Sequence, residues 1–299
     1  MKLAEAINIF DVILKNGPLG TRLKYDYKIE KPVHLAIRDE HGQQALEELY
    51  RGDIAIAQAQ HLPIIIHAGT FRASKNHLPK ECNIKEVNLT CVDFLQDIKD
   101  SYQHLNAPIF IGGPIGSMND AYSVDPYLTA EIAKQYHQEQ VSIFAEAKVD
   151  VIYAVTISNV IEALGIALAA QETTTDYLIG FFLNQNGTLL DGTPLYQAIT
   201  EIDQKTRRRP LGYLVTCTHA SILLELDSAH KEYQRLIGIQ TNGSSLNPSV
   251  LDQLKTHVAD SPEKFAQDLK QLKSKFGLKI LAGCCGTTKE HLLALAKII

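Results

Sequence analysis

The chain has 299 residues, of which 45% are hydrophobic and 21% are charged, so it can form the core of one large barrel or two ordinary domains. Its net charge of −5 and pI near 6.1 argue against a general nucleic-acid binder. No apolar run approaches the ~20 residues that span a bilayer, and Glu5 interrupts the only candidate signal peptide. An odd number of cysteines, five, suits a reducing compartment. We therefore expect a cytoplasmic protein without nucleic-acid or membrane partners.

Eight short apolar runs recur along the chain. Each run is continuous rather than alternating, which is typical of strands buried on both faces. The runs are residues 12–14, 64–68, 109–112, 149–155, 177–183, 213–217, 236–240 and 279–283. Segments with helical spacing separate them. A capping residue before a proline predicts a helix start at residues 125–126 (DP), 193–194 (TP) and 261–263 (SPE).

The end of the chain reads as a further helix. Thr287 and Glu290 have the spacing of a capping box, which predicts a helix that runs to Ile299. Eight strands that alternate with helices predict a single-domain α/β fold, a (β/α)8 TIM barrel over residues 1–299. The alternative is an open doubly wound sheet, but no glycine-rich dinucleotide fingerprint follows an early strand.

Loop lengths favour the barrel. The segments after the first, third, fifth and seventh runs are long, and all four would lie on the face that holds the active site of barrel enzymes. They are residues 16–38, 113–124, 184–192 and 241–259.

Three of the five cysteines follow two of the apolar runs. Cys217 ends one run, and Cys284 and Cys285 follow another. If both runs are strands of one parallel sheet, the three sulfurs emerge at its carboxyl edge. Three thiolates there could bind zinc and leave the open coordination position that distinguishes a catalytic site from a structural one. The vicinal pair is not a standard CxxC motif, so this pattern alone is a weak signal. Cys82 and Cys91 are interpreted as ordinary thiols.

Several motifs point to one family. They are NGPLGTRL at residues 16–23, TFRAS at 70–74, GPIGS at 113–117, NGTLLDGTPL at 186–195, VTC at 215–217 and GCCGT at 283–287. Together they make nearly the whole chain resemble the homocysteine S-methyltransferase family. This family includes betaine–homocysteine methyltransferase and the homocysteine-binding barrel of cobalamin-dependent methionine synthase. GCCGT is the most specific of the matches.

The resemblance implies a (β/α)8 barrel with a Zn²⁺ cofactor and a role in methionine biosynthesis. Its metal ligands and catalytic residues would be Cys217, Cys284 and Cys285. The partners would be a small-molecule thiol and a small sulfonium or ammonium methyl donor, because the chain has no additional domain for folate or cobalamin. The residues expected to bind substrate are Asn16, Gly17, Thr70, Val155 and Thr156. Zinc would hold the acceptor sulfur as the nucleophilic thiolate at neutral pH.

Two departures from the family pattern concern acidic groups that help to hold the substrate amino group. Asn16 stands in place of an aspartate, and Val155 stands in place of a glutamate. A desolvated ammonium group needs anionic or acceptor partners, and valine supplies none. His67 and Arg72 add positive or neutral groups nearby. We therefore expect an acceptor thiol without an ammonium group at the usual place, with an extra carboxylate as one option.

Alternatives remain open at the level of sequence. Asp26 or Asp53 could replace the missing acids. A barrel of the same family that has lost catalysis and binds zinc or a ligand is a second functional class. Redox chemistry at Cys284 and Cys285 is a third and weaker one. His67 and His219 are expected to have capping or packing roles. The sequence predicts neither the methyl donor nor the oligomeric state.

Overall fold

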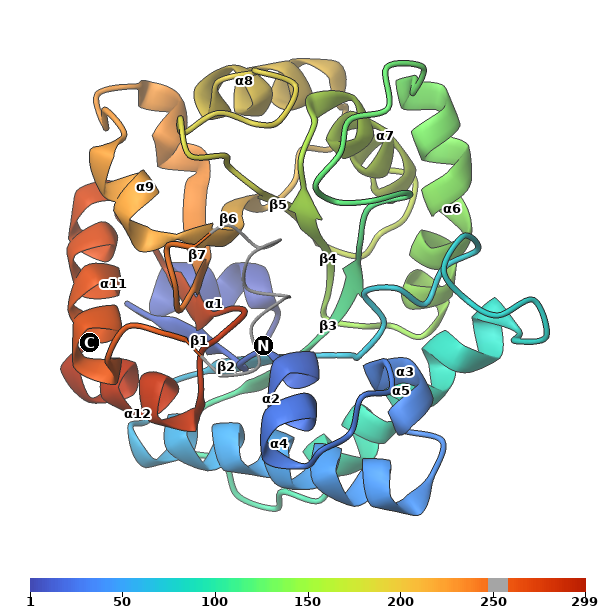
Figure 1. The fold of residues 1–299 in the computed structure, drawn as a ribbon, viewed down its shortest axis with the longest axis vertical. Helices are drawn as coiled ribbons and strands as arrows, with labels where there is room; N and C mark the ends of the chain where they lie inside the picture. Colours follow the sequence, from blue (N-terminus) through green and yellow to red (C-terminus); the bar gives the residue numbers. More distant parts are fainter. Residues whose placement is uncertain (247–257) are drawn as a thin grey trace.

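The computed structural model describes residues 1–246 and 258–299, and its eight parallel strands close into a barrel (Figure 1). The strands are β1 (Ile13–Lys15), β2 (Ile64–His67), β3 (Ile109–Ile115), β4 (Val151–Ile157), β5 (Tyr177–Phe181), β6 (Gly212–His219), β7 (Leu236–Asn242) and β8 (Ile280–Gly283). Each predicted run overlaps one of them, and several strands extend beyond the predicted run. Leu14 pairs with Leu281, which joins β1 to β8. The predicted (β/α)8 barrel is therefore confirmed, and the alternative prediction of an open doubly wound sheet is wrong.

Most helices form a ring around the barrel, whereas α1 (Leu3–Ile9) lies behind the strands near the centre of the view (Figure 1). In the described part of the chain they are α1 (Leu3–Ile9), α2 (Leu19–Asp26), α3 (Val33–Ala36), α4 (Glu40–Ala59), α5 (Ile84–Asp100), α6 (Ala130–Glu146), α7 (Val160–Ala170), α8 (Leu195–Lys205), α9 (Ala220–Glu225), η1 (Lys231–Arg235), α11 (Pro262–Phe276) and α12 (Lys289–Ile298). None of these helices is long and apolar enough to span a membrane.

The predicted helix starts have mixed outcomes. Ser261 caps α11 as predicted, because its hydroxyl accepts from Lys264 N at 3.2 Å. Pro194, rather than the residue before it, is the N-cap of α8. The prediction at residues 125–126 is wrong, because Asp125 accepts from Tyr127 N (2.9 Å) in a turn. The next helix, α6, begins at Ala130.

The last capping box lies one residue later than predicted. Thr288 is the N-cap of α12, and His291 is its reciprocal partner. Thr287 is unavailable because its hydroxyl donates to the carbonyl of Cys284 at 2.8 Å. The helix ends at Ile298, and Ile299 is the C-cap.

Two apolar layers form the core. The larger lies between the strands and the helices. The smaller fills the barrel interior with residues at alternate strand positions: Ile13, Ile65, Phe110, Val151, Tyr153, Val155, Leu178, Leu214 and Ile280. Leu3 and Ala6 of α1 pack against this inner cluster. The apolar filling supports a rigid platform for groups at the carboxyl ends of the strands.

The long segments predicted between strands do follow the expected strands. Residues 16–38 contain the short helices α2 and α3, so this segment is more ordered than a plain loop. Residues 113–115 extend β3. Most of the predicted segment 241–259 lies outside the described residues.

Candidate metal and thiol site

The ends of β6 and β8 bring three thiols together. Ligand atoms of Cys217, Cys284 and Cys285 all lie within 4.8 Å of one another. The Sγ atoms of Cys217 and Cys284 are 2.6 Å apart. Cys217 and Cys284 are buried, whereas Cys285 is exposed at the mouth. The convergence predicted from the two strand ends is therefore present in the structure.

Two strand irregularities aim side chains at this site. Cys217 (φ 53°) and Thr156 (φ 61°) both have positive φ, which costs on the order of 1–3 kcal/mol for a non-glycine residue. Each sits where the register of its strand shifts, between Ala154 and Ile157 or between Thr216 and Thr218. Bulges of this kind redirect side chains. As a result, the Thr156 hydroxyl donates to Cys217 Sγ at 3.1 Å.

The segment after β8 has a tight turn that only certain residues allow. A Cβ on Gly283 would lie 2.2 Å from Thr287 Oγ1, so this position must be glycine while the hydroxyl of Thr287 bonds to Cys284. Gly286 has φ 80°, a left-handed conformation that suits glycine. The GCCGT motif therefore encodes a turn that presents two adjacent sulfurs toward Cys217.

The three thiols strongly affect each other's ionisation. Contacts with Cys217 and Cys285, followed by burial, raise the pKa of Cys284 well above its ordinary value. Hydrogen bonds from Cys217 and Cys284 lower the pKa of Cys285 well below its ordinary value. Within the group, Cys285 therefore loses its proton more readily than Cys284. A cation is needed to keep all three deprotonated.

The donor set fits a zinc ion with an open position. Three sulfurs are a zinc-type ligand set, and a fourth position would stay free for a substrate. Sulfurs on a tetrahedral zinc ion with bonds of ~2.3 Å lie about 3.8 Å apart. The Cys217 and Cys284 sulfurs would have to separate by about an ångström from their 2.6 Å spacing. Small side-chain rotations achieve this.

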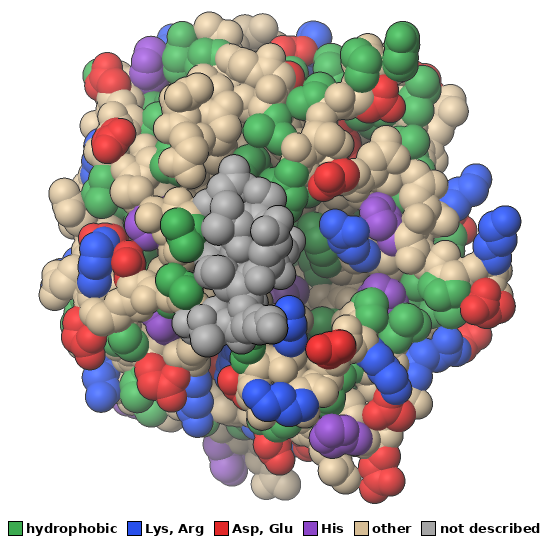
Figure 2. Space-filling model, in the orientation of Figure 1, with side chains coloured by type: hydrophobic (Ala, Val, Ile, Leu, Met, Phe, Trp, Pro, Cys, Tyr) green, Lys and Arg blue, Asp and Glu red, His purple; other side chains and the backbone are tan. Residues whose placement is uncertain are grey.

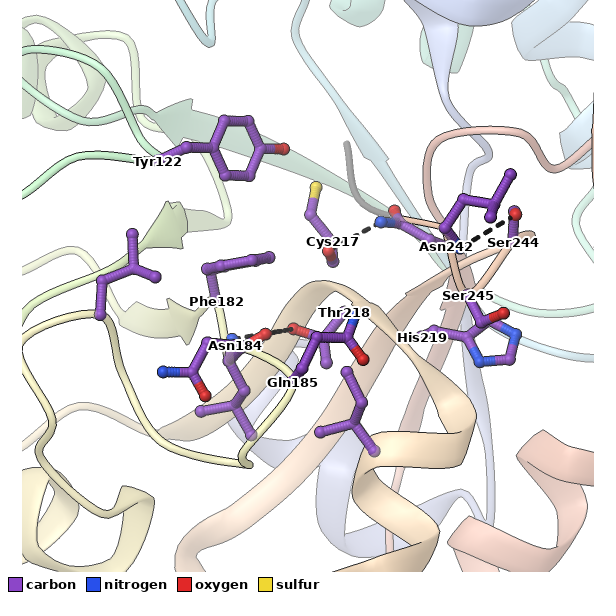
Figure 3. A pocket seen from close by; sticks show the side chains of 14 residues that line it. Tyr122, Phe182, Asn184, Gln185, Cys217, Thr218, His219, Asn242, Ser244 and Ser245 are labelled. Carbon is purple, nitrogen blue, oxygen red and sulfur yellow. Dashed lines mark hydrogen bonds between the residues drawn. The ribbon is translucent and has the colours of Figure 1, made fainter. Parts of the chain in front are cut away.

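A cavity of about 320 Å³ adjoins the thiols (Figure 3). Cys217 and Cys284 pack there with Phe182, whose ring meets Tyr122 edge-on at 5.2 Å between centroids. Asn242 donates to the carbonyl of Cys217 at 2.8 Å, and its Oδ1 is buried without a partner in the described structure. The described lining includes no Lys, Arg, Asp or Glu. The cavity therefore suits a compact ligand that can contact aromatic rings and amide groups.

The predicted substrate-binding residues lie at strand ends around the barrel. Asn16 Oδ1 accepts from His67 N at 3.0 Å, and Gly17 N donates to the carboxylate of Asp53 at 3.1 Å. Thr70 is buried, and its hydroxyl donates to the Pro114 carbonyl at 3.1 Å. These bonds position the loops after β1 and β2. Substrate contact by these residues stays a prediction.

Val155 also lies where the sequence places it. Its side chain belongs to the inner cluster, two positions beyond the inward-facing Tyr153 on β4. The two candidate replacements for the missing acid are elsewhere. Asp26 is exposed on α2. Asp53 is buried and holds Arg22 Nη1 at 2.8 and 2.9 Å. The Asp53 carboxylate is therefore already engaged by Arg22, and the Asp26 carboxylate is on the surface of α2.

A buried polar group inside the barrel was not predicted. Lys15 Nζ lies 3.0 Å from His67 Nδ1 and 3.1 Å from Gln240 Oε1. Tyr153 donates to the same Gln240 oxygen at 2.9 Å. The sequence signal was a lysine directly after the apolar run 12–14, at an inward-facing position two residues beyond Ile13.

His219 has the expected capping role, and His67 makes contacts on two sides. His219 is the N-cap of α9 and accepts from Ser221 N at 3.3 Å. His67 contacts Asn16 and Lys15, so it joins the loop after β1 to the barrel interior. Arg72 is exposed near the ring of Phe71, with 5.9 Å between its guanidinium carbon and the ring centroid. Cys82 and Cys91 lie outside the three-thiol cluster.

Comparison with known proteins shows that residues 13–299 match the family model described as homocysteine S-methyltransferase. The homocysteine methyltransferase MmuM from Escherichia coli, in its metallated form, is similar in fold at 17% identity and a TM-score of 0.76, covering 98% of each chain. Its oxidised form gives 15% identity, a TM-score of 0.73 and 97% coverage of each chain. The chain belongs to the homocysteine S-methyltransferase family, and the predicted enzyme class, thiol S-methyltransferase, is confirmed.

Proposed function

We propose that this enzyme is zinc-dependent and moves a methyl group from a small sulfonium or ammonium donor to a thiol, either homocysteine or a related compound. The observation that carries the proposal is the convergence of Cys217, Cys284 and Cys285 within 4.8 Å at the carboxyl ends of β6 and β8. When bound, zinc would supply a coordination position that keeps the acceptor sulfur as a thiolate. If the acceptor is homocysteine, the product is methionine.

The chain's own residues would orient the reactants. Thr156 fixes the direction of Cys217 through its 3.1 Å hydrogen bond, and the turn at Gly283 fixes the two following cysteines. Phe182 and Leu190 pack around the buried thiols and limit the access of water. Methyl transfer needs an in-line approach in a site of this kind more than it needs acid–base catalysis.

The cavity beside Cys217 supports a cationic donor. The rings of Phe182 and Tyr122 lie edge to face at its wall, beside Cys217 (Figure 3). A methylated cation over an aromatic face gains about 0.5–2 kcal/mol. The unpartnered Oδ1 of Asn242 can accept from a polar group of the donor. The charge needed to attract the donor is then provided by the thiolates and the rings.

The test is methyl transfer by zinc-loaded enzyme under reducing conditions. Sulfonium donors and betaine would be paired with homocysteine and simple thiols, and the methylated product would be identified by mass spectrometry. We expect turnover with at least one pair without cobalamin or folate. An absence of product across the panel, with one zinc per chain confirmed by metal analysis, would contradict the proposal. The alternative of a non-catalytic zinc-binding barrel is not favoured, because the three thiols are all retained.

A further inference from the structure

The barrel interior contains a buried lysine whose ammonium group makes no direct ion pair with a carboxylate of the described residues. The side chain of Lys15 belongs to a residue that is 2% exposed, and its ammonium group contacts a neutral amide and an imidazole. The ring of Tyr153 lies below it at 5.2 Å from the centroid. Within residues 1–246 and 258–299, Lys15 forms no ion pair. A buried charge is costly unless it is paired, so this lysine indicates an anionic partner that arrives from outside.

The register of the strands places Lys15 one level below the thiol site in the sheet. Leu14 pairs with Leu281, and Gln240 pairs with Ala282, so Lys15 and Gln240 precede Cys284 by one inward-facing position. Two residues of strand span about 6–7 Å. Burial lowers the pKa of Lys15 to about 8, and the nearby Cys284 and Cys217 oppose this effect. These groups are therefore close enough to interact through the low-dielectric interior.

The surroundings favour an anionic substrate group over a cationic one. Val155 is on the inner face two residues beyond Tyr153 and supplies no acceptor for an ammonium group. The nearest buried carboxylate to influence Lys15, Asp53, is engaged by Arg22. An ammonium group at this position would be repelled by Lys15. A carboxylate would gain a charged hydrogen bond from it.

A ligand would reach the Lys15 ammonium group from the mouth of the barrel. His67, which contacts Lys15, is only partly buried, and Val155 is 8% exposed. Figure 2 shows a recess on this face of the molecule, with Lys, Arg and His side chains around it and Asp or Glu side chains at its rim. A short thiol with its sulfur at the three cysteines could therefore direct its other end toward Lys15.

We propose that Lys15, positioned by His67 and Gln240, recognises a carboxylate of the acceptor thiol and determines which thiol the enzyme uses. The acceptor class is a short mercapto acid whose carboxylate reaches Lys15 from the mouth of the barrel. This inference rests on the proposed function, because it assigns the acceptor's sulfur to the three-cysteine site. Lys15 is a specificity-determining residue here, and it takes no part in the methyl transfer itself.

The experiment compares two probes of equal length, 4-mercaptobutanoate and its uncharged amide, by calorimetric titration of zinc-loaded protein without donor. We expect the natural protein to bind the carboxylate about ten- to a hundredfold more tightly than the amide. In Lys15→Met this preference should fall to within about threefold, with little change in amide affinity. The exposed Lys24 on α2 provides a matched control, and Lys24→Met should keep the preference.

Several outcomes would overturn the inference. Equal binding of the two probes by the natural protein would overturn it without any variant. Equal weakening of both probes in Lys15→Met does so too, because it assigns Lys15 to balancing the charge of the thiolates. If Lys15→Met fails to fold by circular dichroism, Lys15→Gln replaces it, since glutamine keeps a donor and removes the charge. Retention of the preference in that variant would also overturn the proposal.

The outcome of this binding test can be distinguished from the outcome of the methyl-transfer test. A carboxylate preference without turnover with any donor would support the role of Lys15 and contradict methyl transfer. Turnover of carboxylate and amide thiols at equal efficiency, with equal affinities, would support methyl transfer and overturn the role of Lys15. Failure of the natural protein to bind either probe would overturn the inference.

Discussion

The two sides of the barrel mouth keep the family pattern to different degrees. The thiol side, defined here by Cys217, Cys284 and Cys285 on β6 and β8, retains all three sulfurs and the turn that aims them. The β1–β4 side, defined by Lys15, Asn16, His67 and Val155, has no acid at positions 16 and 155, where the family resemblance leads one to expect them. Activation of a thiol and recognition of its remaining atoms are thus separate tasks on separate strands. Recognition of the remaining atoms can therefore change while activation of the thiol is kept.

The largest expected effect is on the thiol side. Cys217→Ala, Cys284→Ala or Cys285→Ala should each lower zinc affinity by about a hundredfold or more, because two thiolates bind zinc weakly. Competition with a chromogenic chelator under reducing conditions measures the affinity. Cys82→Ala is the control, since Cys82 lies outside the cluster. Full zinc affinity in Cys217→Ala would mean that the thiol side is not a three-cysteine metal site.

The next effect tests whether the β1–β4 side selects the acceptor. Val155→Glu combined with Lys15→Met should increase the use of homocysteine relative to 4-mercaptobutanoate. A charged hydrogen bond to the substrate ammonium is worth about 1.5–3 kcal/mol, or roughly ten- to a hundredfold. The ratio of kcat/KM values for the two acceptors measures the change. Val155→Gln with Lys15→Met is the uncharged control.

A strong natural preference for homocysteine would count against this prediction. If the unmodified enzyme methylates homocysteine far better than any mercapto acid, another group must compensate for Asn16 and Val155. The comparison between the two sides of the mouth would then describe a rearrangement of ammonium recognition rather than its loss.

The sequence predicted the thiol side well because its signals are local. The cysteines come at the ends of two apolar runs, and the turn chemistry of residues 283–287 lies within five positions. The polar group inside the barrel depends instead on the relative register of β1, β4 and β7. Lys15, Tyr153 and Gln240 meet only when the barrel closes. A run as short as 12–14 did not reveal that the next side chain points inward.

Errors at helix starts have a similar physical origin. Asp125 before a proline was expected to cap a helix, and its carboxylate does accept a backbone N–H two residues on. The same bond closes a short turn as readily as it starts a helix. Tertiary contacts then decide the outcome. In contrast, Ser261 precedes a segment with a strong apolar face, and its helix forms as predicted.

A pH series provides a smaller but more specific test of the β1–β4 side. Burial lowers the pKa of Lys15 to about 8, so its ammonium group loses its proton as the pH rises through that value. The charged groups that act on it are Cys217, Cys284 and Asp53, with His67 and Tyr153 as titratable neighbours.

The preference for 4-mercaptobutanoate over its amide should be greatest below about pH 8 and should decline above it. Because both probes share the thiol, ionisation of that thiol affects them equally and cancels in the ratio of dissociation constants. Lys15→Met should show a flat ratio from pH 6.5 to about 9.5, a window on both sides of the shifted pKa. A ratio that rises with pH in the natural protein would contradict a cationic Lys15.

The smallest expected effect concerns the donor and separates it from the acceptor. Phe182→Leu keeps an apolar wall beside Cys217 and removes the ring that faces Tyr122. Loss of one cation–π contact worth about 0.5–1 kcal/mol should raise the donor KM by roughly two- to fivefold, with the acceptor KM unchanged. Initial rates with each substrate varied in turn give both values. A raised acceptor KM with a constant donor KM would place the acceptor, rather than the donor, in the cavity beside Cys217, and the division between the two sides of the mouth would have to be redrawn.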